Sequence, residues 1–450
     1  MKPKKDLTGG SITKNMLLLS FPLVTAMFMQ SMFTIVDTFF VAKLGTDAVA
    51  ALSAVFPIFF IIIAITTGLS VGVSSYISRA IGAKKFEKVS EIAENGLLLS
   101  ILISVAVLIA GAITLKPIIS FLGVADAVGM LMDEYMMIIY IGSSAFFLGQ
   151  AANAILMGEG DTKTPTKGFI IATILNIILD PILIFGFSSI PAMGVKGAAI
   201  ATIIARSAGT IYVFAHLFSG KAIIKLAFKK LTLAYPSMKE ILKVCIPTAA
   251  TQMSVSIGFF FINKLVASFG SNALAGLGIA SRIESIAILP VIALSISTIT
   301  VIGQNMGAGR FDRAKHAFLV ASSTGFIFIE IIGALLFFAG PFFISLFTKN
   351  PDVVSYGASY FKIIALFYGF FALMHIARSG FQATGKALPP LLLSAINFAV
   401  ALLLAYILAF TYNHGTTGIW IGIATADVIA GTASLAWFYT ALHRKTKQAA

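Results

Sequence analysis

Long apolar stretches follow one another along almost the whole chain, and this succession constrains the fold more than any other feature. Twelve stretches are separated by short polar segments, near residues 15–42, 48–78, 92–114, 129–157, 166–187, 194–218, 241–268, 273–304, 315–338, 353–381, 389–411 and 416–442. A helix that crosses a bilayer needs about 20 consecutive apolar residues. Apolar residues make up 58% of the chain and charged ones 11%, which excludes an ordinary soluble domain. We therefore expect an all-α polytopic membrane protein with twelve transmembrane helices.

The loops between these stretches alternate in charge. One set of loops carries most of the lysines and arginines, whereas the opposite loops carry only Lys43, Lys116, Lys196 and Lys349. The positive-inside rule then predicts a multi-pass protein of the cell membrane with both termini in the cytoplasm. A nucleic-acid-binding protein would gather its basic residues on one face, so the net charge of +14 does not indicate a nucleic acid partner.

Several kinds of chemistry find no support in the sequence. Cys245 is the single cysteine, which excludes an intramolecular disulfide or a thiolate metal cluster. The segment "GLSVG" at 68–72 fits the G-x-S-x-G pattern of a nucleophile elbow, but that motif needs a strand-to-helix turn and this segment is expected in a small-residue helix. There is no H-E-x-x-H and no P-loop motif. We expect neither an enzyme nor a resident metal or cofactor, and an ion gradient (H⁺ or Na⁺) as the energy source.

The two halves of the chain repeat each other at an offset of 225 residues. "LGTDAVAAL" at 44–52 aligns with "FGSNALAGL" at 269–277, "IGAKKF" at 81–86 aligns with "MGAGRF" at 306–311, and Gly197 aligns with Gly422. Each half has six helices, an even number, so the two halves enter the membrane in the same direction, which is the parallel-repeat layout of some secondary transporters. We predict two pseudo-symmetric six-helix lobes, at 1–218 and 241–450, joined by a cytoplasmic linker at 219–240.

Polar residues recur on one helix face in two stretches of the first half. Gln30, Thr34 and Asp37 are spaced by four and three residues, and Asn176 and Asp180 are one turn apart. Charged groups cost about 2.5 to 3.5 kcal/mol at the bilayer centre, so those that persist usually face a cavity and act there. The spacing therefore predicts a polar site in the first lobe.

The depths of these residues support their pairing. At about 1.5 Å rise per residue, Asp37 and Asp180 lie roughly 8 and 10 Å below the outer ends of their helices. Thr202, which enters the sixth stretch from the outside, lies at a comparable level, and no basic residue of the first half is expected at this depth. Two carboxylates that are both ionised repel each other, so a proton is readily taken up on one side and released on the other. The alternative is that each aspartate is held by a lysine or by local hydrogen bonds.

Prolines lie inside two of these stretches. Pro181 follows Asp180 directly, and Pro22 lies in the first stretch. A proline removes one backbone hydrogen bond and clashes with the preceding turn, so its helix bends there. The bend is either a static packing feature or a moving part, and the adjacency of Pro181 to Asp180 favours the second.

The second half departs from the first at the acidic positions, because the register partners of Asp37 and Asp180 are Ile262 and Ala405. We therefore expect the ion site in the first lobe, with Glu284 and Asp427 as second-choice cation contacts. Further polar residues lie in the apolar stretches of this half, namely Asn263, Lys264, Arg282, Glu330, His375 and Arg378.

Five segments together resemble one transporter family. They are "SFPLVTAMFMQSMFTIVDTFFVAKLG" at 20–45, "MGEGDTKTP" at 157–165, "LNIILDP" at 175–181, "GVKGAAIAT" at 194–202 and "GQNMGAGRFDRAK" at 303–315. The likeness runs from about Ser11 to the twelfth stretch and is to the multidrug and toxic compound extrusion family, most closely to its prokaryotic DinF-like branch. The resemblance implies a V-shaped pair of six-helix lobes and proton- or sodium-coupled export of organic, often cationic, compounds. It also implies a coupling group in the first lobe, whose motif positions fall on Gln30, Asp37, Asn153, Asn176, Asp180 and Thr202.

The resulting hypothesis is an antiporter for organic, cationic or amphipathic small molecules. Protonation of Asp37, coupled to Asp180, bends the first helix at or near Pro22 and expels the substrate. We expect a monomer with membrane lipids and small-molecule substrates as its only partners. The alternative is an exporter of lipid-linked or polysaccharide intermediates, for which Lys264, Arg282 and Arg378 would supply a cationic cavity. A channel or a non-transporting membrane scaffold is the distant alternative.

Overall fold

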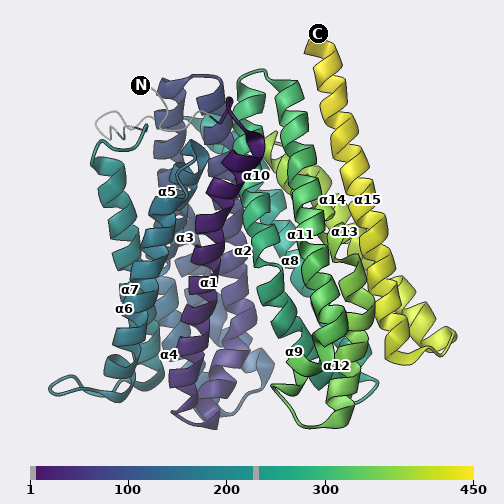
Figure 1. The fold of residues 1–450 in the computed structure, drawn as a ribbon. Coiled ribbons are helices and arrows are strands. Elements are labelled where there is room, and N and C mark those ends of the chain that lie inside the picture. Colours follow the sequence, from purple (N-terminus) through teal and green to yellow (C-terminus); the bar gives the residue numbers. More distant parts are fainter. Residues whose placement is uncertain (1–6, 225, 227–232, 450) are drawn as a thin grey trace. The chain divides into compact units, whose positions relative to one another are not determined.

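The computed structural model describes residues 7–224, 226 and 233–449. The first six residues, with the basic Lys2, Lys4 and Lys5, lie outside the described residues, as do residues 225 and 227–232 of the predicted linker. Within the described ranges the structure is built from helices joined by short loops (Figure 1). Apolar surroundings favour this architecture, because a helix satisfies its backbone hydrogen bonds internally.

The first half contains seven of these helices. They are α1 (Ile12–Ala42), α2 (Thr46–Gly82), α3 (Phe86–Leu122), α4 (Asp126–Ile141), α5 (Ser143–Glu159), α6 (Lys163–Phe185) and α7 (Gly194–Phe218). The second half contains α8 (Tyr235–Ala267), α9 (Ser271–Ala287), α10 (Leu289–Gly307), α11 (Phe311–Ser345), α12 (Pro351–Ile364), α13 (Tyr368–Ala383), α14 (Leu388–Tyr406) and α15 (Gly415–Ala449). A short 3₁₀ turn, Ala365–Phe367, joins α12 to α13, and a π-turn, Ile407–Thr411, ends α14.

These helices confirm the predicted membrane fold. Eleven helical segments of the described residues are long and apolar enough to cross a membrane, and the pair α4 and α5 brings the number to twelve when counted as one. The stretch predicted at 129–157 is a bent span, in which α4 and α5 meet at an angle of 46° at Gly142. The stretch 273–304 is likewise divided, since α9 ends at Ala287 and α10 begins at Leu289 with Pro290 in its first turn.

The aligned glycines Gly197 and Gly422 show why the repeat keeps small residues at one position. A Cβ atom on Gly197 would lie 2.3 Å from the carbonyl oxygen of Leu183, so α7 touches the backbone of α6 there. A Cβ atom on Gly422 would lie 2.4 Å from the backbone nitrogen of Ala405, so α15 touches α14 in the same way. Small residues permit such close helix contacts in membranes, where apolar burial adds little to helix association.

The chain divides into two compact units, and it changes units inside α1, inside α8 and at the last residue of α2. Unit 1 holds Pro22–Ile81 and Lys85–Ile246, and unit 2 holds Pro247–Ala450 together with Asp6–Phe21 and Gly82–Lys84. Each has its own apolar core, with Phe147 among the fully buried side chains of the first and Trp420 among those of the second. Helix α1 therefore begins in unit 2 and continues in unit 1 from Pro22, whereas α8 passes from unit 1 to unit 2 at Pro247.

Side-chain hydrogen bonds hold α1 within both units. Before Pro22, the Ser20 hydroxyl donates to Ser297 Oγ at 2.9 Å in unit 2. From Pro22 onward α6 contacts the helix, because the Thr166 hydroxyl lies 2.8 Å from the Pro22 carbonyl and the Thr173 hydroxyl lies 3.3 Å from the Met29 carbonyl. Each hydroxyl shares its one proton with the carbonyl four residues earlier in α6, at 2.8 and 2.9 Å. These bonds hold the turns of α1 before Pro22 in unit 2 and the turns after it in unit 1.

Helix α8 repeats this arrangement in the opposite sense. Before Pro247, the Ser237 hydroxyl donates to Glu91 Oε1 at 2.7 Å in unit 1. Just after the proline, Gln382 Nε2 donates to Thr248 Oγ1 at 3.1 Å in unit 2. Pro22 and Pro247 are register partners, so the crossing is a property of the repeat.

Two of the motifs act as anchors for chain segments outside the helices. In "MGEGDTKTP", Glu159 accepts backbone hydrogen bonds from Ile223 at 3.2 Å and Ile224 at 2.9 Å, which fixes the start of the linker. In the same motif, Asp161 Oδ1 accepts from the backbone N–H groups of Lys163 and Thr164 at 3.0 and 3.1 Å, which caps α6.

The motif "GQNMGAGRFDRAK" has an equivalent role in unit 2. Arg313 Nη2 donates to the carbonyls of Gly9 and Gly10 at 2.6 and 2.8 Å. Asn305 Nδ2 donates to the Leu7 carbonyl at 3.2 Å. The segment before α1 is therefore fastened to unit 2 as the linker before α8 is fastened to unit 1.

Candidate functional site

Helix α6 brings two of the predicted polar residues together in unit 1. Asn176 and Asp180 are fully buried, and Asn176 Nδ2 donates to Asp180 Oδ1 at 2.8 Å, as the four-residue spacing requires. The other carboxylate oxygen of Asp180 has no partner among the described residues. A buried carboxylate with an open oxygen can accept a proton or a cation at that atom.

Asp37 on α1 lies close enough to Asp180 for their charges to interact. Its Oδ1 atom is buried and has no hydrogen-bond partner among the described residues. Tyr135 on α4 lies within electrostatic range of both aspartates. The two carboxylates that depth estimates paired are thus neighbours, and Tyr135 is a neighbour that the sequence prediction missed. Tyr135 has a register partner of the same type, Tyr360, which is the signal that would have singled it out.

Arg206 on α7 is the second residue absent from the predicted site. Its Nη2 atom donates to Gln30 Oε1 on α1 at 2.7 Å, and it interacts electrostatically with Tyr135. The sequence prediction placed no basic residue of the first half at the depth of the two aspartates, and Arg206 joins the polar group at Gln30. Arg206 stands alone in the middle of an apolar stretch, and this isolation was a usable signal.

Aromatic rings surround the Arg206 guanidinium. Its central carbon lies 4.9 Å from the ring centroid of Phe33, 5.4 Å from that of Phe146 and 5.9 Å from that of Phe169. A cation over an aromatic face gains about 0.5 to 2 kcal/mol. Three such contacts and the Gln30 bond are comparable in size to the cost of about 2.5 to 3.5 kcal/mol for a cation inside a membrane helix. None of the ion pairs between described residues includes Arg206.

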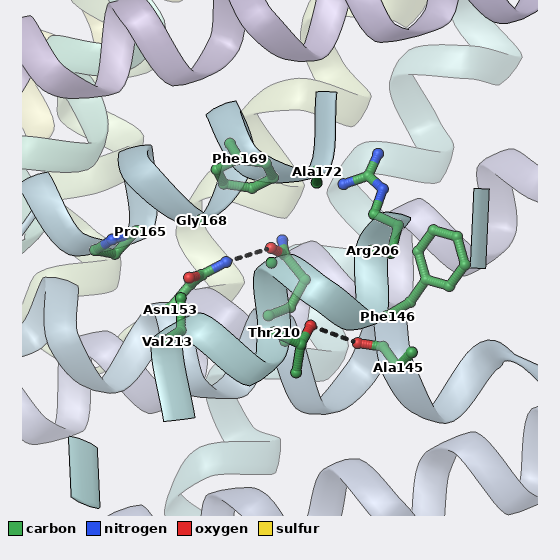
Figure 2. Close-up of a pocket in the computed structure, with 13 residues that line it drawn as sticks. Ala145, Phe146, Asn153, Pro165, Gly168, Phe169, Ala172, Arg206, Thr210 and Val213 are labelled. Atoms are coloured by element: carbon green, nitrogen blue, oxygen red, sulfur yellow. Dashed lines mark hydrogen bonds between the residues drawn. The ribbon is translucent and has the colours of Figure 1, made fainter. Parts of the chain in front are cut away.

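A cavity of about 40 Å³ lies beside this arginine, between α5, α6 and α7. Asn153 and Gln150 both line it, and Asn153 Nδ2 donates to Gln150 Oε1 at 3.4 Å, the bond drawn from Asn153 in Figure 2. The Asn153 Oδ1 atom is buried without a partner among the described residues. The cavity wall also includes Phe146, Phe169 and Arg206. Asn153 therefore belongs with the cavity, and Gln150 is a lining residue that the sequence prediction missed.

The remaining predicted residues of the first lobe lie in different surroundings. Thr202 is 4% exposed, precedes Arg206 by one turn of α7, and its hydroxyl has no partner among the described residues. Thr34 is exposed and its hydroxyl donates to the carbonyl of Gln30 in its own helix at 3.2 Å. The structure thus brings Thr202 to the buried side of the site but not Thr34. Pro22 and Pro181 both lie within unbroken helices.

Unit 2 contains an acidic pair of its own. The Tyr360 hydroxyl donates to Glu284 Oε2 at 2.7 Å, and Asn397 Nδ2 donates to Asp427 Oδ1 at 3.0 Å. Glu284 and Asp427 interact electrostatically. Among residues 7–224, 226 and 233–449, no three His, Cys, Asp or Glu side chains gather as a metal ion would require. The role of Glu284 and Asp427 as second-choice cation contacts stays a prediction.

The basic residues proposed for a cationic cavity do not share one environment. Lys264 and Arg282 are exposed and lie on α8 and α9. Arg378 on α13 is buried, and its Nη2 atom donates to Ser394 Oγ at 3.0 Å. His375 stacks on Phe371 with ring centroids 4.1 Å apart, which is the environment of an interior histidine.

The chain has two repeats of membrane helices, and one repeat contains buried carboxylates. These are features of a polytopic membrane transporter. The MatE family model matches residues 22–182 and 247–407, and the chain belongs to this family. The two matched ranges are 225 residues apart and begin at Pro22 and Pro247, which confirms the internal repeat. Members of the family are transporters, so this chain is a transporter and not an enzyme.

Relatives of known name match along nearly the whole chain. A protein named FAD transporter from Shewanella oneidensis is 29% identical over 96% of this chain and 96% of its own. A probable multidrug resistance protein, YoeA of Bacillus subtilis, is 28% identical over 93% of this chain and 92% of its own. Among solved structures, an outward-facing multidrug resistance MATE family transporter of the MOP superfamily matches with a TM-score of 0.93, at 27% identity over 99% of this chain and 100% of that one.

Proposed function

We propose that this transporter is a secondary active antiporter that exports organic compounds in exchange for inward flow of H⁺ or Na⁺. The observation that carries the proposal is the pair Asp37 and Asp180, two interacting carboxylates inside unit 1 with buried oxygens that have no partner among the described residues. Repulsion between two ionised carboxylates is relieved when one of them takes up a proton or when both share a cation. The pair is therefore suited to load and release a coupling ion.

The contacts of α1 offer a route from ion binding to a change of shape. Gln30 and Asp37 both lie on α1, and this part of the helix is held to α6 through Thr166 and Thr173 and to α7 through Arg206. Loading Asp37 with a proton changes the charge that holds the helix beside Asp180. Bending at Pro22 then moves the segment that carries both Gln30 and Asp37, because a proline turn lacks one backbone hydrogen bond.

The energy of one coupling ion is adequate for export. A proton that moves down a potential of 100 mV supplies about 2.3 kcal/mol. Each unit of pH difference adds about 1.4 kcal/mol. Under both gradients together, one proton therefore supports a concentration ratio of several hundredfold for a neutral substrate. We further propose that the protein acts as a monomer in the cell membrane with both termini in the cytoplasm.

Efflux of a fluorescent dye from cells tests the role of the carboxylate pair. We expect Asp37→Asn to lose most of the efflux of the wild type, because the amide cannot take up a proton. Asp47→Asn is the matched control, since Asp47 is an exposed carboxylate in the first turn of α2. Equal efflux by Asp37→Asn and wild type, at equal protein levels, would show that Asp37 carries no coupling.

Reconstituted vesicles decide which ion is used. Purified protein in vesicles is given only a pH gradient or only a sodium gradient, and substrate movement is followed in each case. We expect movement under the pH gradient. Movement under sodium alone would assign sodium as the coupling ion, and flux without any gradient requirement would indicate a channel. Movement of lipid-linked sugars in place of dyes would indicate the alternative export function.

The names of the relatives leave the substrate open within this function. One is named for FAD and others for multidrug resistance, so membership of the family does not choose between an anionic nucleotide and a cationic drug. The chemistry of the cavity beside Arg206 is the feature of this chain that bears on the choice.

A further inference from the structure

Arg206 is a cation without a counter-ion among the described residues, and it lines a cavity. No aspartate or glutamate of the described residues is among those that line this cavity. The polar groups that do line it are the amides of Gln150 and Asn153 and the hydroxyl of Thr210. A buried arginine would repel a purely cationic substrate, so a site for such a substrate does not require one.

The Arg206 guanidinium also has N–H donors that lack an acceptor. An arginine carries five N–H donors in a planar fork, which matches the two oxygens of a carboxylate. The structure shows one side-chain acceptor, Gln30 Oε1, and leaves Nε buried with no hydrogen-bond partner among the described residues. A buried polar group without a partner is uncommon in folded proteins and indicates a missing water, ion or ligand group. The cavity wall therefore has an open position for an anion.

The volume of the cavity limits the size of the group that it can accept. A cavity needs about 10 to 15 Å³ to admit one water molecule, so a cavity of about 40 Å³ admits a small polar group. Pockets for whole drug-sized ligands are about 300 to 1,000 Å³. In this conformation the cavity thus holds one small group of a larger molecule. A carboxylate has three non-hydrogen atoms, whereas a phosphate has five.

The rings beside the arginine indicate what carries this group. Phe146 and Phe169 belong to the cavity wall, and both face the guanidinium within about 6 Å, as does Phe33 on α1. Aromatic side chains stack with aromatic ligands and leave the arginine free to bind a group at the ligand's edge. The side-chain N–H groups of Gln150 and Asn153 add neutral donors on another wall (Figure 2).

We propose that this cavity is a receptor for the carboxylate of an aromatic acid, with Arg206 as the group that binds it. The inference rests on the proposed export function and names a substrate class for it: aromatic carboxylic acids, including zwitterions that carry a separate amine. A carboxylate binds a guanidinium more strongly than an amide oxygen does, so the incoming group displaces Gln30 Oε1. Substrate binding thereby removes one of the contacts that hold α1 in unit 1.

Matched pairs of small probes test the receptor on the purified protein at neutral pH. The probes are 2-naphthoate, 2-naphthamide and 2-naphthyl phosphate, and the readout is the dissociation constant from calorimetry. We expect the carboxylate to bind about tenfold or more tightly than the amide, the difference that a charge-assisted pair makes. We expect the phosphate to bind more weakly than the carboxylate because of its size. Equal binding of acid and amide would overturn the proposal, and tighter binding of the phosphate would overturn the carboxylate class.

Variants assign the preference to Arg206. We expect Arg206→Gln to abolish the discrimination between acid and amide, and Arg206→Lys to retain part of it through the charge alone. Arg79→Gln is the matched control, because Arg79 on α2 also lies against an aromatic ring, that of Tyr76, at 5.4 Å. An equal loss in Arg79→Gln would show a nonspecific effect and refute the assignment. If Arg206→Gln does not fold, the comparison of the three probes on wild-type protein still decides.

The displacement of Gln30 has a separate readout. Backbone hydrogen exchange in the α1 segment 22–30 should rise about threefold when 2-naphthoate is bound and remain unchanged with 2-naphthamide, since one membrane hydrogen bond is lost. An unchanged rate with the carboxylate would refute this step. A failure of the receptor is distinguishable from a failure of the export function, because dye efflux that depends on Asp37 does not require any preference between acid and amide.

Discussion

One carboxylate, that of Glu159, accepts two backbone hydrogen bonds from the start of the linker, and replacing Glu159 by glutamine tests how strongly it holds that segment. Glu159 Oε1 accepts from the backbone N–H of Ile224 at 2.9 Å, and Oε2 accepts from that of Ile223 at 3.2 Å. The side chain is 7% exposed, so water replaces a lost bond only poorly. Glutamine keeps one accepting oxygen and places an NH₂ group where the second oxygen was, which turns one bond into a contact between two donors.

The magnitude follows from the bond that is lost. A hydrogen bond to a charged group contributes about 1.5 to 3 kcal/mol, and we take about 2 kcal/mol for the one bond. This value corresponds to a rise of roughly 30-fold in the equilibrium constant for local opening. Ala222 and Ile224 remain buried in the core of unit 1, which keeps the opening local.

Hydrogen exchange measures this opening at the amides that make the bonds. We expect the Ile223 and Ile224 amides to exchange about 30-fold faster in Glu159→Gln, because exchange follows the population of the open form. The Ala234 amide, which donates to Asn95 Oδ1 at 3.0 Å, should not change. Glu87→Gln is the control, since Glu87 is an exposed glutamate in the first turn of α3. Unchanged exchange at Ile223 and Ile224 would refute the view that Glu159 anchors the linker.

Two further outcomes follow from the packing of the helices. Gly197→Ala should lower the melting temperature by several degrees, because its Cβ atom would lie 2.3 Å from the Leu183 carbonyl oxygen and overpacking costs about 1 to 3 kcal/mol. Gly278→Ala is the control and should not lower the melting temperature, because nothing lies within 4 Å of its Cβ atom. Equal melting temperatures of the two variants would refute the close contact at Gly197. Thr166→Val should raise hydrogen exchange in the α1 segment after Pro22 about threefold through loss of the 2.8 Å bond to the Pro22 carbonyl. Thr114→Val is the control, since the Thr114 hydroxyl bonds only within its own helix at 2.8 Å, and the same rise there would contradict the prediction.

The features that the sequence predicted are those set by spacing along one helix or by the repeat. Asn176 and Asp180 are one turn apart, and a helix brings their side chains together whatever surrounds it. Gly197 and Gly422 occupy equivalent places because the repeat preserves the approach of the last two helices of each half. The helices themselves follow from apolar length, since a bilayer admits few other structures.

The features that the sequence did not reveal depend on contacts between helices. Arg206 is stabilised by an amide oxygen on α1 and by rings from three different helices, and no spacing in the sequence reports such an arrangement. The bend at Gly142 is of the same kind, because a Cβ atom there would lie 2.2 Å from the side chain of Ile203 on α7. A glycine inside an apolar stretch does not show by itself which neighbour requires it.

The crossing of the chain between units gives the two aligned prolines a common physical meaning. Each lies where a helix leaves one unit for the other, at Phe21 to Pro22 and at Ile246 to Pro247. The turn before each proline lacks one backbone hydrogen bond, so it bends at lower cost than any other turn of the helix. Hydrogen bonds fasten α1 through Ser20 in unit 2 and through Thr166 in unit 1.

Helix α8 is fastened through Ser237 in unit 1 and through Thr248 in unit 2. The helix segments before and after each proline are thus held within different units. We infer that Pro22 and Pro247 act as a pair. The proposed coupling carboxylates, Asp37 and Asp180, lie on α1 and α6, so a coupling ion bound there acts first on the helix that contains Pro22.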